Sequence, residues 1–229
     1  SEMCIRDRYT LEEVIRLANT FYIVRHGQTN WNILGKTQGH GNSDLTQKGE
    51  EQAFELAKAI KEYPIDYIYS SDLGRAVQTA EIVGDQIGVK VNQTKSLREM
   101  GFGDWEGLLI DEIKKNHAKT YETWRNQPHL ADIPNGETLH IIKDRVDAFI
   151  KELNEKYNNK HILLVSHSVT VRVMLLSFLN SGMENIYRIK QDNTALNIVE
   201  CRNYGPVIIK MNDTSHIKNN EKLNNSALE

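Results

Sequence analysis

Two short, unbroken apolar runs constrain the fold of this chain more than any other feature. Residues 21–24 (Phe-Tyr-Ile-Val) and 162–165 (Ile-Leu-Leu-Val) show no polar alternation, which predicts buried strands of the kind found in parallel sheets. The first run ends at Arg25-His26-Gly27 and the second at Ser166-His167. Because ligands bind at the carboxyl ends of strands in open α/β sheets, we expect His26 and His167 to lie at one sheet edge.

The segments around these strands have patterns of their own. Helices are predicted at 47–62, 75–87, 136–157 and 170–179, from apolar residues at helical spacing and from residues that mark helix ends. Strands are predicted at 65–69, 89–91, 195–200 and 207–211, the last two as an antiparallel pair, and residues 31–43 as a loop. This alternation favours an α/β fold, a three-layer helix–sheet–helix sandwich with a mainly parallel sheet.

The length of 229 residues and 26.3 kDa suits one domain with an inserted cap. We assign residues 20–211 to that domain and place the cap at about 108–136. Residues 1–19 precede it as an extension, in which 11–18 could form a short helix and 1–8 are interpreted as non-native. Residues 212–229 are polar and rich in Asn and Lys, so we expect a disordered tail.

Charge and composition narrow the partners and the compartment. The net charge of −3 gives no sign of nucleic-acid binding, so any anion site must be a local basic pocket. No apolar run approaches the ~20 residues that span a bilayer, and the N-terminus lacks the apolar core of a signal peptide. Cys4 and Cys201 imply no disulfide framework. We expect a cytoplasmic monomer or homodimer with no nucleic-acid or membrane partner.

The end of the first strand has the donors of a phosphate site. Arg25 places a positive charge beside the imidazole of His26, and Asn32 adds a further donor. Gly27 allows a sharp turn or the close approach of a ligand. Arg75 lies in the first turn of a predicted helix, where a cation opposes the helix dipole, which suggests a role toward a ligand. The alternative for each is an ordinary solvated surface residue.

The string Arg25-His26-Gly27-x-Thr29-x-x-Asn32 resembles the signature of the histidine phosphatase superfamily, the phosphoglycerate-mutase-like proteins. Four further blocks follow in the order of that family: Gln38-Gly39 before Asp44-Leu45-Thr46 and Gly49, Ser70-Ser71-Asp72-Leu73-x-Arg75-Ala76-x-Gln78-Thr79-Ala80, Glu99-x-x-Phe102-Gly103-x-Trp105-Glu106-Gly107, and Val165-Ser166-His167. The resemblance covers residues 20–211 and implies one antiparallel strand near an edge of the sheet.

The resemblance also implies a role for each matched residue. His26 is the expected nucleophile, which forms a phosphohistidine, and Glu99 is the expected general acid and base. Arg25, Arg75 and His167 are expected to hold the phosphoryl group, with Asn32, Gln38, Gly39 and Ser168 as further phosphate-binding positions. Glu106 and Glu137 compete with Glu99 for the acid role. No cofactor and no metal are expected, because no His, Cys and Asp cluster has metal-ligand spacing.

The function implied is a metal-independent phosphomonoesterase acting on a small phosphorylated metabolite. The segment 102–107 (Phe-Gly-Asp-Trp-Glu-Gly) resembles broad-specificity, α-ribazole-phosphate and fructose-2,6-bisphosphate phosphatases. A cofactor-dependent phosphoglycerate mutase is the alternative within the same fold, and a non-catalytic phosphate-binding module is a third hypothesis. Ser168 stands where the family usually has Gly, so it could crowd the phosphate or add a hydroxyl donor to it.

Overall fold

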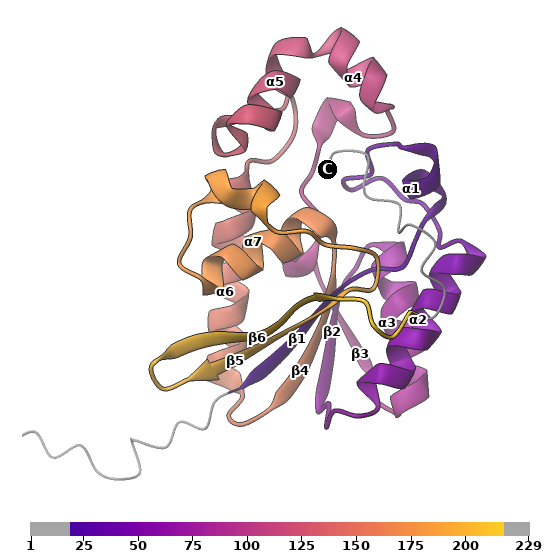
Figure 1. Ribbon diagram of the computed structural model, residues 1–229, viewed down its shortest axis with the longest axis vertical. Helices are drawn as coiled ribbons and strands as arrows, with labels where there is room; N and C mark the ends of the chain where they lie inside the picture. Colours follow the sequence, from indigo (N-terminus) through magenta and orange to yellow (C-terminus); the bar gives the residue numbers. More distant parts are fainter. Residues whose placement is uncertain (1–18, 218–229) are drawn as a thin grey trace, which may run out of the picture.

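The computed structural model describes residues 19–217. The predicted helix 11–18, residues 1–8 and residues 218–229 lie outside the described residues. Among residues 19–217, six strands form a sheet in the order β3-β2-β4-β1-β5-β6 (Figure 1). The strands are β1 (Thr20–Arg25), β2 (Tyr67–Ser71), β3 (Val91–Thr94), β4 (His161–Ser166), β5 (Leu196–Arg202) and β6 (Gly205–Asp213).

The strand directions confirm the predicted mainly parallel sheet. β1 pairs in parallel with β4, and β2 pairs in parallel with both β4 and β3. β5 pairs antiparallel with β1, and β6 pairs antiparallel with β5. β5 alone therefore runs against the other strands of this sheet, one position from the edge.

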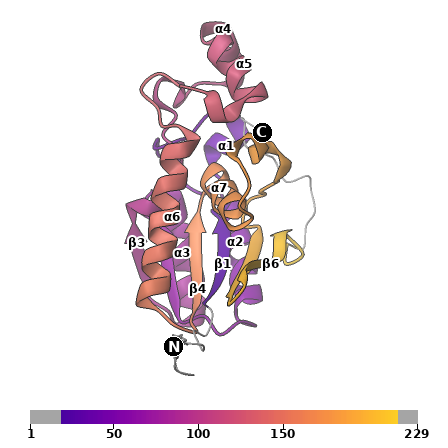
Figure 2. The same ribbon diagram turned by 90° about the vertical axis from the view of Figure 1, so that its left-hand side faces the viewer.

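Two pairs of long helices cover the two faces of the sheet. α2 (Gln47–Ile60) and α3 (Gly74–Ile87) pack on one face, and α6 (Leu139–Lys156) and α7 (Ser168–Phe178) on the other (Figure 2). Along β1, Tyr22 and Val24 join the core under α2 and α3, whereas Phe21 and Ile23 join the core under α6 and α7. Both faces are thus buried, which is why the run 21–24 has no polar alternation.

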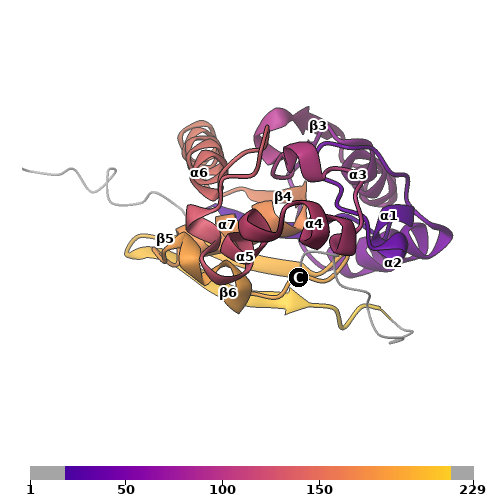
Figure 3. The same cartoon turned by 90° about the horizontal axis from the view of Figure 1, so that it is seen from above.

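The predicted cap at 108–136 contains α4 (Ile110–Asn116), α5 (Ala118–Asn126) and the short η3 (Pro128–Leu130). Figures 1 and 3 show α4 and α5 above the sheet, beyond the ends of β1 and β4. Trp124 of α5 is buried and meets the ring of Phe102 edge-on, with ring centroids 5.6 Å apart. This contact joins the cap to the segment that carries Glu99.

Several element boundaries differ from the sequence prediction. α1 (Asn30–Leu34) lies inside the predicted loop 31–43, started by a capping box between Thr29 and Asn32. β2 extends to Ser71, whereas the predicted strand ends with the last apolar residue at position 69. The two serines that follow are buried and continue the strand although they are polar. α7 begins at Ser168 instead of residue 170, and β6 runs to Asp213, two residues into the predicted tail. Within residues 19–217, no helix is long and apolar enough to cross a membrane.

Candidate active site

Strand register brings the two predicted histidines together. β1 and β4 pair Arg25 with Ser166, so the next residue on each strand is His26 and His167. Both imidazoles are buried, and their ring centroids lie 5.1 Å apart. The expectation that His26 and His167 share one sheet edge is confirmed.

A small cavity of about 40 Å³ opens in front of this pair. Eight of the residues predicted for the site line it: Arg25, His26, Asn32, Gln38, Gly39, Arg75, Glu99 and Ser168. His167 is not among the lining residues, but its ring contacts the ring of His26. We call this cavity the phosphate pocket.

The imidazole of His26 is held in one orientation. Its Nδ1 lies 2.7 Å from the carbonyl oxygen of Gly27, and because a carbonyl only accepts, Nδ1 carries the proton. Nε2 keeps its lone pair and accepts from Nε of Arg75 at 3.3 Å. Burial, with the charges of Arg75 and Arg25, holds the pKa of His26 well below its usual range. A neutral imidazole with Nε2 toward the pocket can attack an electrophile.

Arg75 is the second residue of α3 and is buried, so its predicted place in the first helical turn is confirmed. Its Nη1 donates to the Gly41 carbonyl at 2.8 Å and its Nη2 to the Gly39 carbonyl at 2.7 Å. Burial lowers the pKa of Arg75 to about 10, so the guanidinium stays charged at neutral pH. The loop thus holds both terminal nitrogens of the guanidinium, and Arg75 presents a fixed charge and its Nε beside His26 Nε2.

Arg25 is anchored in a similar way. It is the last residue of β1, it is buried, and its Nη1 donates to the Gln191 carbonyl at 2.6 Å. Both arginines are therefore preset by main-chain carbonyls on different loops. A site built this way needs little rearrangement to receive a dianion.

The two ring nitrogens of His167 are buried polar atoms without a hydrogen-bond partner among the described residues. His167 is the N-cap residue of α7 and is fully buried. Burial and the nearby charge of Arg75 hold its pKa well below its usual range. Buried polar atoms are normally paired, so these nitrogens are candidates for contact with a bound oxyanion.

The carboxylate of Glu99 lies at the N-terminus of α7. Its Oε1 accepts from the backbone N–H groups of Met100 at 2.9 Å and Thr170 at 3.2 Å, and from the Thr170 hydroxyl at 3.2 Å. Its Oε2 accepts from the N–H of Val169 at 3.3 Å. These four hydrogen bonds fix the carboxylate where it lines the phosphate pocket.

The two competing carboxylates have other contacts. Glu106 accepts from the backbone N–H groups of His40 at 2.8 Å and Phe102 at 3.0 Å. Glu137 accepts from the N–H of Gly101 at 2.7 Å and from Arg145 at 3.0 Å. Of the three candidates only Glu99 lines the phosphate pocket, so the geometry favours it for the acid role.

Three of the further predicted phosphate-binding residues have different surroundings. The Oδ1 atom of Asn32 accepts a hydrogen bond from the backbone N–H of Thr29 at 3.0 Å. The amide nitrogen of Asn32 therefore points away from Thr29. Gly39 has φ +52, and a Cβ there would lie 2.1 Å from Glu106 Oε1, so this turn requires glycine. Ser168 begins α7 and lines the pocket. Either effect of its hydroxyl on the phosphate, crowding or binding, stays a prediction.

Position 27 requires glycine for a packing reason that the sequence did not predict. A Cβ on Gly27 would lie 2.5 Å from the Gly49 carbonyl oxygen, and a Cβ on Gly49 would lie 2.1 Å from the Gln28 carbonyl oxygen. The two glycines thus let the backbone after β1 touch the start of α2. The close approach predicted at Gly27 is to another segment of the chain.

A family model for the histidine phosphatase superfamily, branch 1, matches residues 21–214. The chain belongs to the histidine phosphatase superfamily. Members similar to this chain carry several activities in their names. Phosphoserine phosphatase 1 of Hydrogenobacter thermophilus is 29% identical over 195 residues, which are 85% of this chain and 92% of that protein. A "probable phosphoglycerate mutase GpmB" of Shigella boydii is 33% identical over 205 residues, covering 86% of this chain and 94% of that protein.

The fold agrees with solved structures of the same superfamily. The α-ribazole phosphatase of Shigella flexneri superposes with a TM-score of 0.78 at 28% identity, and the match covers 85% of this chain and 96% of that chain. This agreement supports the predicted phosphoglycerate-mutase-like sandwich.

Three residues that line the phosphate pocket were not predicted from the sequence. Lys36, Thr37 and Val169 also line it. The ammonium of Lys36 lies 5.8 Å from the centroid of the Trp31 ring, and Thr37 is buried. The signal available in the sequence was proximity, since Lys36 and Thr37 directly precede the predicted positions Gln38 and Gly39.

The two neutral histidines predict a pH-dependent stability. In the unfolded chain each takes a proton near pH ~6.5, but both folded-state pKa values are lowered. The stability they contribute is complete above that pH and is lost as the pH falls. We expect a loss of about 2 kcal/mol between about pH 7 and 5.5, from ~1.4 kcal/mol per pH unit and proton.

Urea unfolding across this pH range measures the effect. A His26→Asn, His167→Asn double variant is the reference, because it keeps the contribution of His216, whose pKa is also lowered by burial. Added phosphate should reduce the dependence of the free energy of unfolding on pH in the unmodified protein, but not in the double variant. Equal slopes for the two proteins would contradict the assignment of neutral imidazoles.

Proposed function

We propose that this chain is a phosphomonoesterase that hydrolyses a small phosphorylated metabolite through a phosphohistidine on His26. The observation that carries this proposal is the state of His26. Its proton is on Nδ1, its Nε2 faces Arg75, and burial keeps it neutral. Membership of the histidine phosphatase superfamily supports the same chemistry.

In the first half of the reaction, His26 Nε2 attacks phosphorus and the bond from phosphorus to the leaving oxygen breaks. Arg25, Arg75 and His167 stabilise the charge on the equatorial oxygens, which is the main requirement of phosphoryl transfer. Glu99 gives its proton to the leaving alkoxide.

In the second half, Glu99 as a carboxylate takes a proton from water, which attacks the phosphohistidine. The phosphorus–nitrogen bond breaks, inorganic phosphate is released, and neutral His26 is restored. The four hydrogen bonds that Glu99 accepts hold its carboxylate in place for this step. A cytoplasmic location and the absence of nucleic-acid and membrane partners belong to the same proposal.

We propose that this reaction needs no metal ion, because two buried guanidinium groups supply the positive charge at the pocket. Turnover of p-nitrophenyl phosphate is therefore expected to survive prolonged dialysis against EDTA. The measurement is the steady-state rate before and after dialysis, with Mg²⁺ and Zn²⁺ added back separately. Loss of activity that either ion restores would show that the proposed mechanism is wrong.

The relatives named as phosphoserine phosphatase and phosphoglycerate mutase suggest substrates that carry a carboxylate. Lys36 is a cation of the pocket that the phosphoryl chemistry does not use. We expect Lys36→Met to raise KM for phosphoserine or 3-phosphoglycerate about tenfold, the effect of one charge-assisted hydrogen bond. KM for p-nitrophenyl phosphate should change much less. Equal changes in KM for both substrate types would contradict a role of Lys36 in substrate recognition.

A phosphoglycerate mutase is the second candidate, supported by the similarity to the GpmB protein. The two functions separate when the protein is mixed with 3-phosphoglycerate and a trace of 2,3-bisphosphoglycerate. We expect phosphate release to exceed isomerisation. Faster isomerisation would make the mutase the better assignment, and retained vanadate binding without any turnover would support a non-catalytic module.

A further inference from the structure

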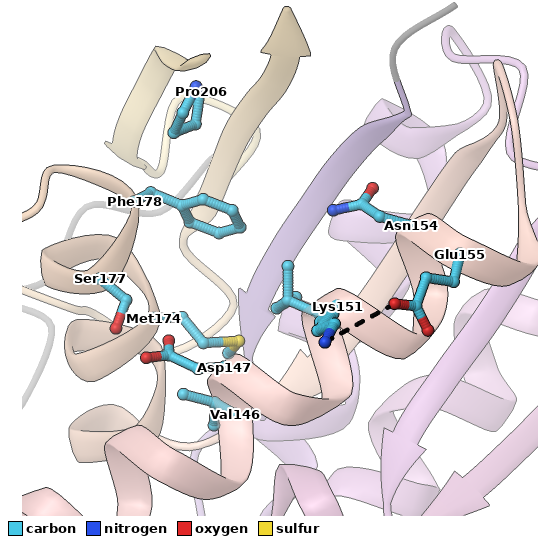
Figure 4. Close-up of a pocket in the computed structure, with 10 residues that line it drawn as sticks. Val146, Asp147, Lys151, Asn154, Glu155, Met174, Ser177, Phe178 and Pro206 are labelled. Atoms are coloured by element: carbon cyan, nitrogen blue, oxygen red, sulfur yellow. Dashed lines mark ion pairs between the residues drawn. The ribbon is translucent and has the colours of Figure 1, made fainter. Parts of the chain in front are cut away.

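The leaving group of a small substrate bound at His26 contacts the phosphate pocket and not the larger cavity of this chain. That cavity, of about 530 Å³, is bounded by α6, α7 and the start of β6, and it shares no lining residue with the phosphate pocket (Figure 4). Two charged residues on its wall pair with each other, with 3.8 Å between Lys151 Nζ and Glu155 Oε1 (Figure 4). Residues that select the leaving group are therefore to be found on the walls of the phosphate pocket.

Thr37 is a wall residue of the phosphate pocket to which the proposed reaction gives no role. Its backbone is fixed on both sides, because its N–H donates to the Leu108 carbonyl at 3.0 Å and its carbonyl accepts from the Gly107 N–H at 2.8 Å. Lys36 and Leu109 continue this contact as an antiparallel bridge. Since the cap begins at about residue 108, Thr37 lies where the phosphate pocket meets the cap.

The hydroxyl of Thr37 is a buried polar group without a partner. Thr37 is 2% exposed, and its Oγ1 has no hydrogen-bond partner among residues 19–217. The side-chain oxygen of Gln38, which also lines the phosphate pocket, is buried and unpartnered in the same part of the chain. Buried polar atoms are normally paired, because an unmade hydrogen bond destabilises the folded protein. Two such atoms on adjacent residues of one pocket indicate a ligand that supplies their partners.

The chemistry of these two atoms limits what the ligand can carry. A hydroxyl both donates and accepts, whereas an amide oxygen only accepts. A group that satisfies both must therefore have an N–H or O–H donor. The oxygens of a phosphate dianion have no such donor, so the donor belongs to the leaving group.

We propose that Thr37 is a specificity-determining residue that binds an amino or hydroxyl group on the leaving group of the substrate. This inference rests on the proposed phosphatase function. The side-chain oxygen of Gln38 accepts from the same group, and Lys36, the residue before Thr37 in the same pocket, supplies the cation for a neighbouring carboxylate. The substrate class is then a phosphate monoester of a small amino acid or hydroxy acid.

Thr37→Val tests this role, because it exchanges the hydroxyl for a methyl group of similar size. The substrates are phosphoserine, 3-phosphoglycerate and the phosphate ester of 3-hydroxypropanoate, which lacks the amino or hydroxyl group of the other two. We expect kcat/KM for the better of the first two to fall about tenfold, the effect of one hydrogen bond to a charged group. The loss for the third ester should be much smaller. Thr37→Ser, which keeps the hydroxyl, should retain most of the preference.

Thermal unfolding without substrate gives a second readout. Because the hydroxyl is unpartnered in the free protein, Thr37→Val should leave Tm unchanged or raise it. The matched control is Thr79→Val, which should lower Tm, since the buried Thr79 hydroxyl accepts from the Gly27 N–H at 3.0 Å and donates to the Arg75 carbonyl at 2.8 Å. Equal decreases in Tm for the two variants would show that Thr37 already has a partner in the protein, and would overturn the proposal.

Hydrolysis of p-nitrophenyl phosphate separates this proposal from the proposed function, because its leaving group has no amino or hydroxyl donor. If the unmodified protein releases phosphate from none of these esters, the phosphatase function is wrong and the role of Thr37 falls with it. If it hydrolyses p-nitrophenyl phosphate but neither phosphoserine nor 3-phosphoglycerate, only the role of Thr37 is wrong. The same conclusion follows if Thr37→Val loses equal activity toward the esters with and without the donor, or loses none.

Discussion

Replacing His26 with alanine is expected to lower kcat by on the order of 10⁵-fold or more, the scale of removing a covalent nucleophile from a hydrolase. The reason is that Nε2 of His26 has no substitute of matching geometry. The ring of His167 contacts that of His26, but His167 is the N-cap residue of α7 and does not line the phosphate pocket. The measurement is steady-state phosphate release together with binding of vanadate to the variant.

The matched control is His40→Ala, which removes an imidazole close to the site. His40 Nε2 contacts the Glu99 carbonyl at 2.9 Å, and His40 does not line the phosphate pocket. We expect His40→Ala to retain most of the turnover, while His26→Ala retains vanadate binding without turnover. Comparable losses in the two variants would indicate that His26 acts through structure and is not the nucleophile.

The second large effect is expected for Glu99→Gln, and it should depend on the leaving group. An alkoxide leaves only when it is protonated, whereas p-nitrophenolate is a stable anion. Positioned acid catalysis contributes ~10²–10⁴-fold. We therefore expect a loss of this size in the phosphorylation rate with phosphoserine or a sugar phosphate, and a much smaller loss in the burst with p-nitrophenyl phosphate. Dephosphorylation should slow with both, because Glu99 is also the base.

Rapid-mixing kinetics separates the burst from steady-state turnover. Glu137→Gln is the matched control, since Glu137 is a neighbouring carboxylate that binds Gly101 and Arg145 away from the pocket. It should show no dependence on the leaving group. Equal burst losses with both substrate types in Glu99→Gln would place the acid elsewhere, with Glu106 and Glu137 as the remaining candidates.

The core of this fold was predictable because its signals are local. The runs 21–24 and 162–165 are buried on both faces by helices, and that burial is what their unbroken apolar character encodes. Element ends were harder to predict, since they depend on contacts between distant segments. β2 continues through Ser70 and Ser71 because both are buried, although neither is apolar.

The predicted site residues came together largely because strand ends bring sequence motifs to one place. Their mutual geometry was not predictable. Glu99 accepts from Val169 and Thr170, about 70 positions away, and no local pattern shows that a carboxylate will lie at that helix end. The anchoring of Arg75 by Gly39 and Gly41 likewise depends on the path of a loop. Lys36 belongs to no sequence motif, so its place in the pocket is seen only in the folded structure.

The most direct test of the mechanism is to identify the phosphorylated atom. The protein would be mixed rapidly with phosphoserine or p-nitrophenyl phosphate, quenched in alkali, and analysed by peptide mass and ³¹P NMR. We predict one phosphoryl group, on Nε2 of His26, formed before phosphate is released. A phosphoryl group on His167 or on Nδ1 of His26, or full turnover without any phosphohistidine, would contradict this mechanism.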